Sequence, residues 1–333
     1  MILAAVLVQI LDPAIFLSPY NTTAKGEWIY PGAYLKTTFT GTSAALHFDT
    51  PGYQGAAPKF RWSVDGEPLR TGQATARLTL AEGLRPGGHS LVVYLAATDA
   101  NYDRWSEPRQ MVRLRALELD DGATVRRPRG LRKKRVVFFG DSITEGAWNL
   151  GDSYRVVEKK WVEWVKHSDA TQAWPYYLAR SLNAEYGVMG SGGMSWLRPS
   201  HSNIPPLPES WRFHYKGLAR EWRERPDMVV VNMGTNDGER DTTAAAARWL
   251  GEVRREWPRA RIVLLIPFGQ QNKARLLAAA ESGAEVIDLG PAFAEGLNKY
   301  GAGSAASFDG LHPNAVTSER LAEAVRSRIS RRP

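Results

Sequence analysis

Ser142 has a residue type and a position suited to nucleophilic chemistry. The segment from Val136 to Phe139 is an unbroken run of β-branched and aromatic residues, and Gly140, Asp141 and Ser142 follow it. Such a run predicts a strand buried on both faces of a parallel sheet. Ligands bind beyond the carboxyl ends of these strands, so Ser142 is a candidate nucleophile. A simple strand-to-helix turn with an N-cap is the alternative interpretation.

Asp309 and His312 could activate that serine. The segment from Phe308 to Asn314 reads Phe-Asp-Gly-Leu-His-Pro-Asn and places an acid three residues before a histidine. A loop with this spacing can bring the carboxylate to the imidazole, fix its tautomer and support the imidazolium that forms when it takes a serine proton. Taken alone, a pair with this spacing is more often structural.

Two further segments could donate hydrogen bonds to an oxyanion. An apolar run leads into Gly190-Ser191-Gly192-Gly193-Met194, where the glycines allow backbone N–H groups to approach a ligand closely. Another run leads into the segment Asn232 to Asp237, where the amide of Asn236 could donate. A plain tight turn and an Asx turn are the respective alternatives.

Residues 136–333 must position these side chains, and their pattern alternates strands with helices. This alternation predicts a parallel sheet with helices on both faces, built from right-handed crossovers. The expected strands are Val136 to Phe139, Ala184 to Met189, Met228 to Met233, Arg261 to Phe268 and Glu285 to Leu289. The expected helices are Trp174 to Leu182, Leu218 to Arg223, Thr242 to Trp257, Asn272 to Ser282 and Val316 to about Ile329.

Residues 1–125 have a different period. Phe60, Trp62 and Val64 alternate with polar residues, and Asp65-Gly66 then supplies a hairpin turn signal. Period-two patterning is typical of antiparallel sheets packed face to face. We therefore expect an antiparallel β-sandwich of jelly-roll type. Its many aromatic residues are typical of a small sandwich core, and a sugar-stacking platform is the alternative.

The charge of the chain is concentrated between these two regions. The net charge is +8, and the segment from Arg126 to Arg135 alone holds seven Lys or Arg and no acid. Because it also contains Pro128 and Gly130, it predicts a solvated basic linker at 126–135, and no nucleic-acid-binding motif supports another role.

The remaining composition excludes several classes. The chain has no cysteine, which excludes disulfides, a thiolate zinc site and a cysteine nucleophile. The apolar N-terminus is too short to span a bilayer and lacks a convincing signal-peptide pattern. The lack of a signal-peptide pattern favours a cytoplasmic location, with secretion as the alternative, and the short apolar stretch predicts no membrane association.

The four motifs together, in this order, closely resemble the signature blocks of the SGNH (GDSL) hydrolase family. The resemblance implies a flavodoxin-like three-layer α/β/α domain that hydrolyses esters through a serine acyl-enzyme. It implies Ser142 as nucleophile and backbone oxyanion donor, His312 as base and Asp309 as its orienting acid. It also implies Gly193 and Asn236 as oxyanion donors, with Gly192 as a rival to Gly193, and no metal or organic cofactor.

A sandwich ahead of such a domain is similar to carbohydrate esterase family 2. The stretches from Gly26 to Leu35 and from Phe39 to Ser43 resemble the start of that family's sandwich. This resemblance implies removal of acetyl groups from an oligo- or polysaccharide, and it leaves a homo-oligomer open. Asp141, Trp148 and Trp196 are candidate substrate-binding residues.

Two other functions remain as alternatives. One is a lipase or thioesterase of the same family acting on longer acyl chains, and the other is a non-catalytic carbohydrate-binding or surface protein. A Trp-rich insertion from Ala147 to Ala173 departs from the family pattern and leaves the substrate open.

Overall fold

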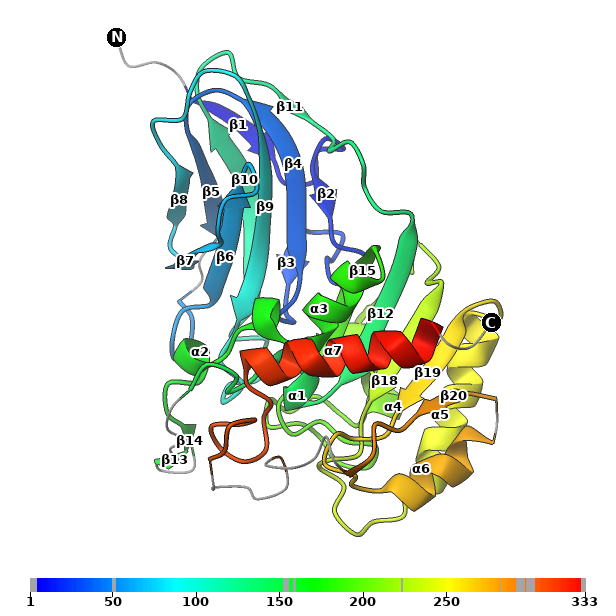
Figure 1. Ribbon diagram of the computed structural model, residues 1–333. Helices are drawn as coiled ribbons and strands as arrows, with labels where there is room; N and C mark the ends of the chain where they lie inside the picture. Colours follow the sequence, from blue (N-terminus) through cyan, green and yellow to red (C-terminus); the bar gives the residue numbers. More distant parts are fainter. Residues whose placement is uncertain are drawn as a thin grey trace.

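The computed structural model describes residues 5–49, 52–151, 156–157, 160–222, 224–281, 283–291, 297 and 303–330. Figure 1 shows two regions, an all-β region in blue and cyan and a region of mixed helices and strands in green to red. The second region carries all of the predicted reactive side chains. The predicted order of an antiparallel sandwich followed by an α/β region is confirmed.

Two antiparallel sheets form the N-terminal sandwich. One contains β1 (Val6–Gln9), β3 (Glu27–Trp28), β5 (Ala44–Asp49), β8 (Arg77–Ala81) and β10 (Val112–Leu119). The other contains β2 (Phe16–Leu17), β4 (Tyr34–Thr40), β6 (Lys59–Val64), β7 (Arg70–Gln73), β9 (Gly88–Ala97) and β11 (Val125–Arg126). Inward-facing residues of both sheets share one core, which includes Leu46, Phe60 and Val93. The aromatic residues Trp28 and Trp62 lie in this core, as the more conservative interpretation expects.

A parallel sheet forms the centre of the second region. Its strands in spatial order are β15 (Ala184–Gly190), β12 (Lys134–Gly140), β18 (Met228–Asn232), β19 (Arg261–Leu265) and β20 (Glu285–Ile287). Numbered along the chain this order is 2-1-3-4-5, the order of flavodoxin-like folds. The direction of winding reverses between β15 and β18, on either side of β12. Ser142 lies two residues beyond the end of β12 and therefore at the switch point, where such sheets bind ligands.

Helices cover both faces of the parallel sheet. Side chains of α3 (Trp174–Ser181) and α7 (Ala315–Ser330) pack on the face that includes Val136 and Phe138. The opposite face, with Val137 and Phe139, packs against α4 (Leu207–Ser210), α5 (Thr243–Glu256) and α6 (Lys273–Ala280). Successive residues of β12 thus enter two different cores, which is why the predicted run needs no polar alternation. The long red helix α7 crosses the sheet face in Figure 1.

The remaining short elements lie in the loops. They are α1 (Ser142–Glu145), β13 (Val156–Val157), β14 (Lys160–Trp161), α2 (Trp164–His167), the 3-10 turn η1 (Ala170–Gln172), β16 (Phe213–Tyr215) and β17 (Leu218–Ala219). Residues 152–155 and 158–159 of the predicted Trp-rich insertion lie outside the described residues.

One predicted helix is wrong. Residues from Leu218 onward were expected to be helical, but Leu218 and Ala219 form β17, which pairs with β16. Gly217 adopts a φ of +82° between the two strands, a conformation that glycine supplies without strain. The hairpin turn therefore decides the local structure rather than helix propensity.

The sandwich covers the edge strand β15 of the parallel sheet. Asn21 donates from its side-chain amide to the Val188 carbonyl at 2.7 Å and accepts from the Val188 N–H at 2.8 Å. The Tyr34 hydroxyl accepts from the Tyr186 N–H at 3.1 Å. An exposed sheet edge would otherwise offer these groups to another chain. Gly187 allows the close approach, because a Cβ there would lie 2.4 Å from the Pro19 carbonyl oxygen.

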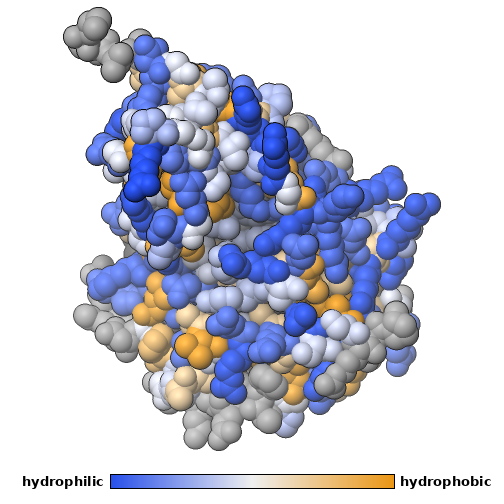
Figure 2. All heavy atoms as spheres, turned by 45° about the horizontal axis from the view of Figure 1, so that its top comes forward, coloured by the Kyte–Doolittle hydropathy of each residue, from blue (hydrophilic) through white to orange (hydrophobic). Residues whose placement is uncertain are grey.

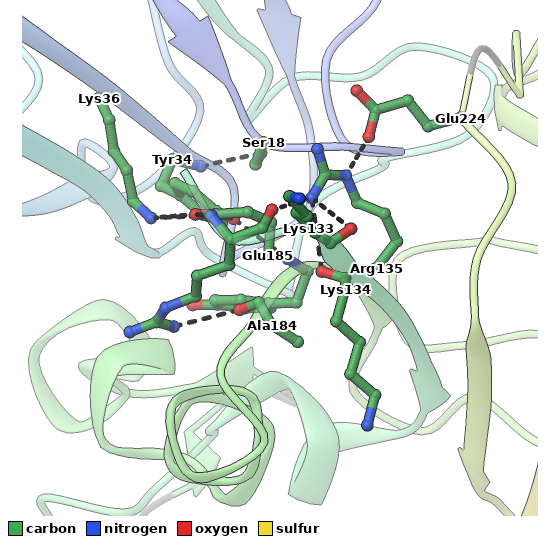
Figure 3. A network of polar contacts seen from close by, with 11 residues as sticks. Ser18, Tyr34, Lys36, Lys133, Lys134, Arg135, Ala184, Glu185 and Glu224 are labelled. Atoms are coloured by element: carbon green, nitrogen blue, oxygen red, sulfur yellow. Dashed lines mark hydrogen bonds and ion pairs between the residues drawn. The ribbon is translucent and has the colours of Figure 1, made fainter. Parts of the chain in front are cut away.

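The basic segment between the regions has ordered partners. Figure 3 shows Arg135 beside Glu224 and a cluster of donors around Glu185. The Arg132 N–H donates to Glu185 at 3.2 Å, and the Arg132 guanidinium donates to the Ala184 carbonyl at 3.1 Å. Arg129 and Lys133 are exposed, while Arg132 and Arg135 contact carboxylates of the parallel-sheet region. The domain boundaries at 125 and 136 stay predictions.

The surface shows no large apolar face in the view of Figure 2, where hydrophobic side chains lie in small groups among hydrophilic ones. Among the helices that are described, none has the length and apolar character needed to cross a bilayer.

Candidate active site

Ser142 is the first residue of α1, and only Asp141 separates it from the end of β12. Asp141 is the N-cap of this helix, and its carboxylate accepts from the Ile143 N–H at 3.0 Å. The helix is a single turn, so its dipole is small and its uncapped N–H groups matter more. Within the described residues the Ser142 N–H has no hydrogen-bond partner. The Ser142 residue is 5% exposed, which leaves a narrow approach to its hydroxyl.

His312 lies between Asp309 and Ser142 and contacts both side chains. The His312 Nε2 atom lies 2.8 Å from the Ser142 Oγ, and the His312 Nδ1 atom lies 2.6 Å from the Asp309 Oδ2. All three side chains are buried. The distances allow the imidazole to receive the serine proton while the carboxylate fixes its orientation. Two segments 170 residues apart in the chain are thus in contact at the predicted pair.

The loop geometry holds Asp309 in its ionised form. Its Oδ1 accepts from the His312 N–H at 2.8 Å, the Leu311 N–H at 3.0 Å and the Ser307 hydroxyl at 3.0 Å. Burial acts to raise the pKa of Asp309, but the charge of His312 and these hydrogen bonds outweigh it and lower that pKa to about 2. The carboxylate is therefore charged at any pH at which His312 would act as a base.

The glycine-rich turn follows β15, the neighbour of β12. The Gly192 N–H donates to the Glu145 Oε2 at 2.8 Å, so this group is already engaged. Gly193 adopts a φ of +76°, and its N–H has no partner among the described residues. A Cβ at Gly193 would lie 2.7 Å from the His201 ring, so glycine is required there for space as well as conformation. This arrangement favours Gly193 over Gly192 as an oxyanion donor.

Asn236 reaches the same place from the loop after β18. Its side-chain amide donates to the Met194 carbonyl at 3.0 Å and contacts the Asp141 Oδ2 at 3.4 Å. The second contact is long for a hydrogen bond, so that N–H is weakly engaged. The next residue, Asp237, accepts from the N–H groups of Trp196 and Leu197 and ties this loop to the glycine-rich turn.

Direct substrate contact by Asp141, Trp148 and Trp196 is not supported. Asp141 has no exposed area, and both tryptophans are 1% exposed. Trp148 packs against Trp164 and stacks on His167, while the Trp196 indole packs on Trp249 and donates to the Met233 carbonyl. Both tryptophans thus contribute large buried apolar area to the core. The predicted role of the three residues in substrate binding has no exposed surface to support it.

Burial shapes the charge around Ser142. Desolvation raises the pKa of Asp141 to about 6, although its hydrogen bond with Ile143 and the charge of His312 oppose the shift. Burial lowers the pKa of His201, and the positive charges of Arg198 and His312 lower it further. A carboxylate and an imidazole with pKa values shifted in opposite directions are typical of a functional site.

Two buried charges beside this site are not among the predicted residues. Glu145 lies on α1 and contacts Gly192, while Arg104 of the sandwich lies 2.8 Å from Glu145. An acid inside the Gly-Asp-Ser-Ile-Thr-Glu-Gly segment was visible as a signal, but no local pattern marks Arg104. Within the part of the chain that is described, no cluster of three or more His, Asp or Glu side chains could hold a metal ion.

Comparison with known proteins agrees with this arrangement. Residues 138–320, more than half of the chain, match the model of the GDSL-like lipase/acylhydrolase family. The chain belongs to this family. Residues 20–105 match the model of the carbohydrate esterase 2 N-terminal domain, as the resemblance of the sandwich predicted. Membership of an acylhydrolase family supports hydrolysis of carboxylic esters. A search of curated protein sequences found no match.

Several solved structures share the whole two-region fold. A family two carbohydrate esterase from Clostridium thermocellum, in complex with cellohexaose, is 20% identical with a TM-score of 0.76, over 95% of this chain and 98% of that one. A family two carbohydrate esterase from Cellvibrio japonicus is 18% identical with a TM-score of 0.76, over 98% of both chains. An acetyl xylan esterase from the rumen bacterium Butyrivibrio proteoclasticus is 14% identical with a TM-score of 0.75, over 98% of this chain and 100% of that one. At these identities the likeness establishes the fold alone.

Proposed function

We propose that this chain is a serine esterase that removes acetyl groups from a carbohydrate through an acyl-enzyme. The observation that carries the proposal is the buried line of contacts from Asp309 through His312 to the Ser142 hydroxyl, at 2.6 and 2.8 Å. The N–H groups of Ser142 and Gly193, which have no partner among the described residues, and the weakly engaged amide of Asn236 support it, because they lie on neighbouring loops.

In the first half of the reaction, His312 takes the Ser142 proton as the Ser142 oxygen bonds to the acetyl carbonyl carbon. The carbonyl oxygen becomes an oxyanion, which the N–H groups of Ser142, Gly193 and Asn236 stabilise. The bond to the sugar oxygen then breaks, and His312 returns the proton to that oxygen. Asp309 supports the charged imidazole throughout.

In the second half, water replaces the sugar. His312 takes a proton from the water as its oxygen bonds to the acyl carbon, and the bond to the Ser142 oxygen breaks. The serine recovers its proton and acetate leaves. Each half transfers one proton in each direction, so the enzyme returns to its starting state without a cofactor.

The substrate class rests on two supports. The carbohydrate part of the proposal rests on the match of residues 20–105 to the carbohydrate esterase 2 N-terminal model and on the shared fold. The small acyl group is supported by the slight exposure of Ser142 and His312, which leaves little room for a long chain beside the hydroxyl.

Chain-length and substrate assays test the proposal. We expect faster turnover of 4-nitrophenyl acetate than of the butyrate or octanoate, and acetate release from at least one member of a panel of acetylated oligosaccharides. Faster turnover of octanoate would favour a lipase or thioesterase instead. Ser142→Ala should lower kcat at least about 10,000-fold while the protein stays folded. Carbohydrate binding by a wild-type protein with no esterase activity would indicate a binding protein.

A further inference from the structure

The loop between β9 and β10 of the sandwich lies behind the glycine-rich turn. The Arg104 N–H donates to the Ser202 carbonyl at 3.0 Å, and the Ser202 hydroxyl donates to the Ala100 carbonyl at 2.9 Å. All three residues are fully buried. The segment 98–104 is therefore built into the loop that follows the turn, rather than resting on its surface.

Arg104 carries a charge into this buried contact. Its guanidinium donates to the Thr98 carbonyl at 2.9 Å and lies 2.8 Å from the Glu145 carboxylate, with both side chains 1% exposed or less. The contact with Glu145 is an ion pair that is poorly aligned as a hydrogen bond. Burial raises the pKa of Glu145, and Arg104 acts against that shift. Burying an arginine costs desolvation free energy, so an arginine in this position is expected to have a role toward its partner.

Glu145 in turn fixes the peptide groups of the turn. Its second carboxylate oxygen accepts from the Gly192 N–H at 2.8 Å, and the Gly192 carbonyl accepts from the His201 N–H at 2.8 Å. That carbonyl and the Gly193 N–H belong to one planar trans peptide and point in opposite directions. Holding Gly192 at both groups therefore sets the direction of the Gly193 N–H.

The glycine-rich turn packs closely against its neighbours. A Cβ at Gly190 would lie 2.7 Å from the Glu145 backbone nitrogen, and one at Gly192 would lie 2.7 Å from the Trp164 ring. The turn is thus in direct contact with α1 on one side and with a buried tryptophan on the other. A small movement of Glu145 would therefore displace the glycine-rich turn as well.

We infer that Arg104 of the sandwich is a positioning residue for the oxyanion-binding turn, acting through Glu145 on Gly192 and so on the Gly193 N–H. The inference rests on the proposed function, since it assigns a supporting residue to the same reaction. It also gives the sandwich a part in turnover that does not depend on contact with substrate.

Three variants of the full chain test the inference. Arg104→Met leaves Glu145 buried without its cation, and it should lower kcat for 4-nitrophenyl acetate about 10- to 100-fold with KM within about threefold, since one misdirected donor costs less than a lost one. Arg104→Met/Glu145→Gln removes both charges but keeps an acceptor for Gly192, and its kcat should recover to within about tenfold of wild type. Arg104→Met/Glu145→Met is equally neutral but has no acceptor, so its kcat should stay low.

The matched control is Lys36→Met, which removes the cation of another ion pair between the same two regions, Lys36 with Glu185. It should leave kcat within about twofold of wild type. The rate at which a fluorophosphonate labels Ser142 should follow kcat across the series, because phosphonylation also develops charge on an oxygen beside the turn. Thermal unfolding of each variant identifies the temperature range in which it is folded.

The outcomes are distinct. Wild-type kcat in folded Arg104→Met, or equal kcat in the Gln and Met double variants, would overturn the inference. If Arg104→Met does not fold, the two neutral double variants decide, with at least a tenfold difference in kcat supporting it. A wild-type protein that neither hydrolyses the ester nor reacts with the fluorophosphonate would overturn the proposed function instead.

Discussion

The two ends of β15 join the sandwich through similar residues but in different ways. At the amino end, Glu185 accepts from both Lys36 and the Tyr34 hydroxyl at 2.5 to 2.8 Å, and from the Arg132 N–H at 3.2 Å. At the carboxyl end, Glu145 has one poorly aligned cation, Arg104, and one backbone donor. Both carboxylates are 1% exposed.

The electrostatic consequence is opposite at the two ends. Burial acts to raise the pKa of Glu185, but Lys36 and the other donors outweigh it and lower that pKa. Burial raises the pKa of Glu145 and of Asp141, and their partners do not compensate. A carboxylate kept where its environment disfavours its charge is typical of a functional site. Charge at the amino end thus stabilises the architecture, while charge at the carboxyl end orients the reactive groups.

Among the variants that compare the two ends, Asp309→Asn at the reactive end should have the largest effect. An asparagine amide can donate to the His312 Nδ1 and so fix the wrong tautomer, which should lower kcat on the order of 10,000-fold. Steady-state hydrolysis of 4-nitrophenyl acetate measures this change. If the variant kept kcat within tenfold of wild type, Asp309 would not orient the base.

Asn236→Ala should have the next largest effect. The loss of one oxyanion donor should lower kcat about 100- to 1,000-fold, because the donor acts on charge present only in the transition state. The midpoint of urea unfolding should change little, since the Asn236 amide makes one normal hydrogen bond and one long contact. A change in KM with unchanged kcat would assign Asn236 to ground-state binding instead.

Asp141→Asn tests the electrostatic cost at the carboxyl end. Because the folded pKa of Asp141, about 6, lies above its ordinary value of 3.8, its contribution to stability is present below pH 3.8 and is lost as the pH rises through 6. Asparagine keeps the N-cap but has no charge. Between pH 4.5 and 7.5 the variant should therefore gain about 2 kcal/mol relative to wild type in the free energy of unfolding, measured with urea. Parallel curves for the two proteins would contradict this.

Glu185→Gln should show the smallest effect, with the opposite sign. The lowered pKa of Glu185 means that its contribution is present above pH 4.5 and is lost as the pH falls through the folded pKa. The variant should lose about 1 to 2 kcal/mol of unfolding free energy at pH 7, less at pH 3.5, and keep its kcat. A loss of kcat without a loss of stability would erase the distinction between the two ends.

The sequence was sufficient for the fold class, and its motifs include the residues Asp309 and His312 that lie in line with Ser142. The roles of these residues stay proposals. The apolar runs of the sequence mark the strands, and in this fold the ends of neighbouring strands meet at one edge, so the order of the motifs predicts their proximity. Arg104 could not be predicted, because it lies 41 positions from Glu145 in another region and no local period marks it. Trp148 and Trp196 could not be assigned either, since a tryptophan near a site is equally suited to a core.

The side chains that cover β15 bear on how the chain can be divided. Asn21 and Tyr34 occupy backbone groups of that strand which would otherwise be open to a neighbouring molecule. A shortened polypeptide lacking the sandwich would present an unpaired strand, and its Gly187 would leave room for the backbone of another molecule in place of Pro19. Recombinant truncation should thus yield a protein that self-associates. Exchange of one sandwich for another would succeed only if the new sandwich placed an asparagine and a tyrosine against the backbone groups of Val188 and Tyr186.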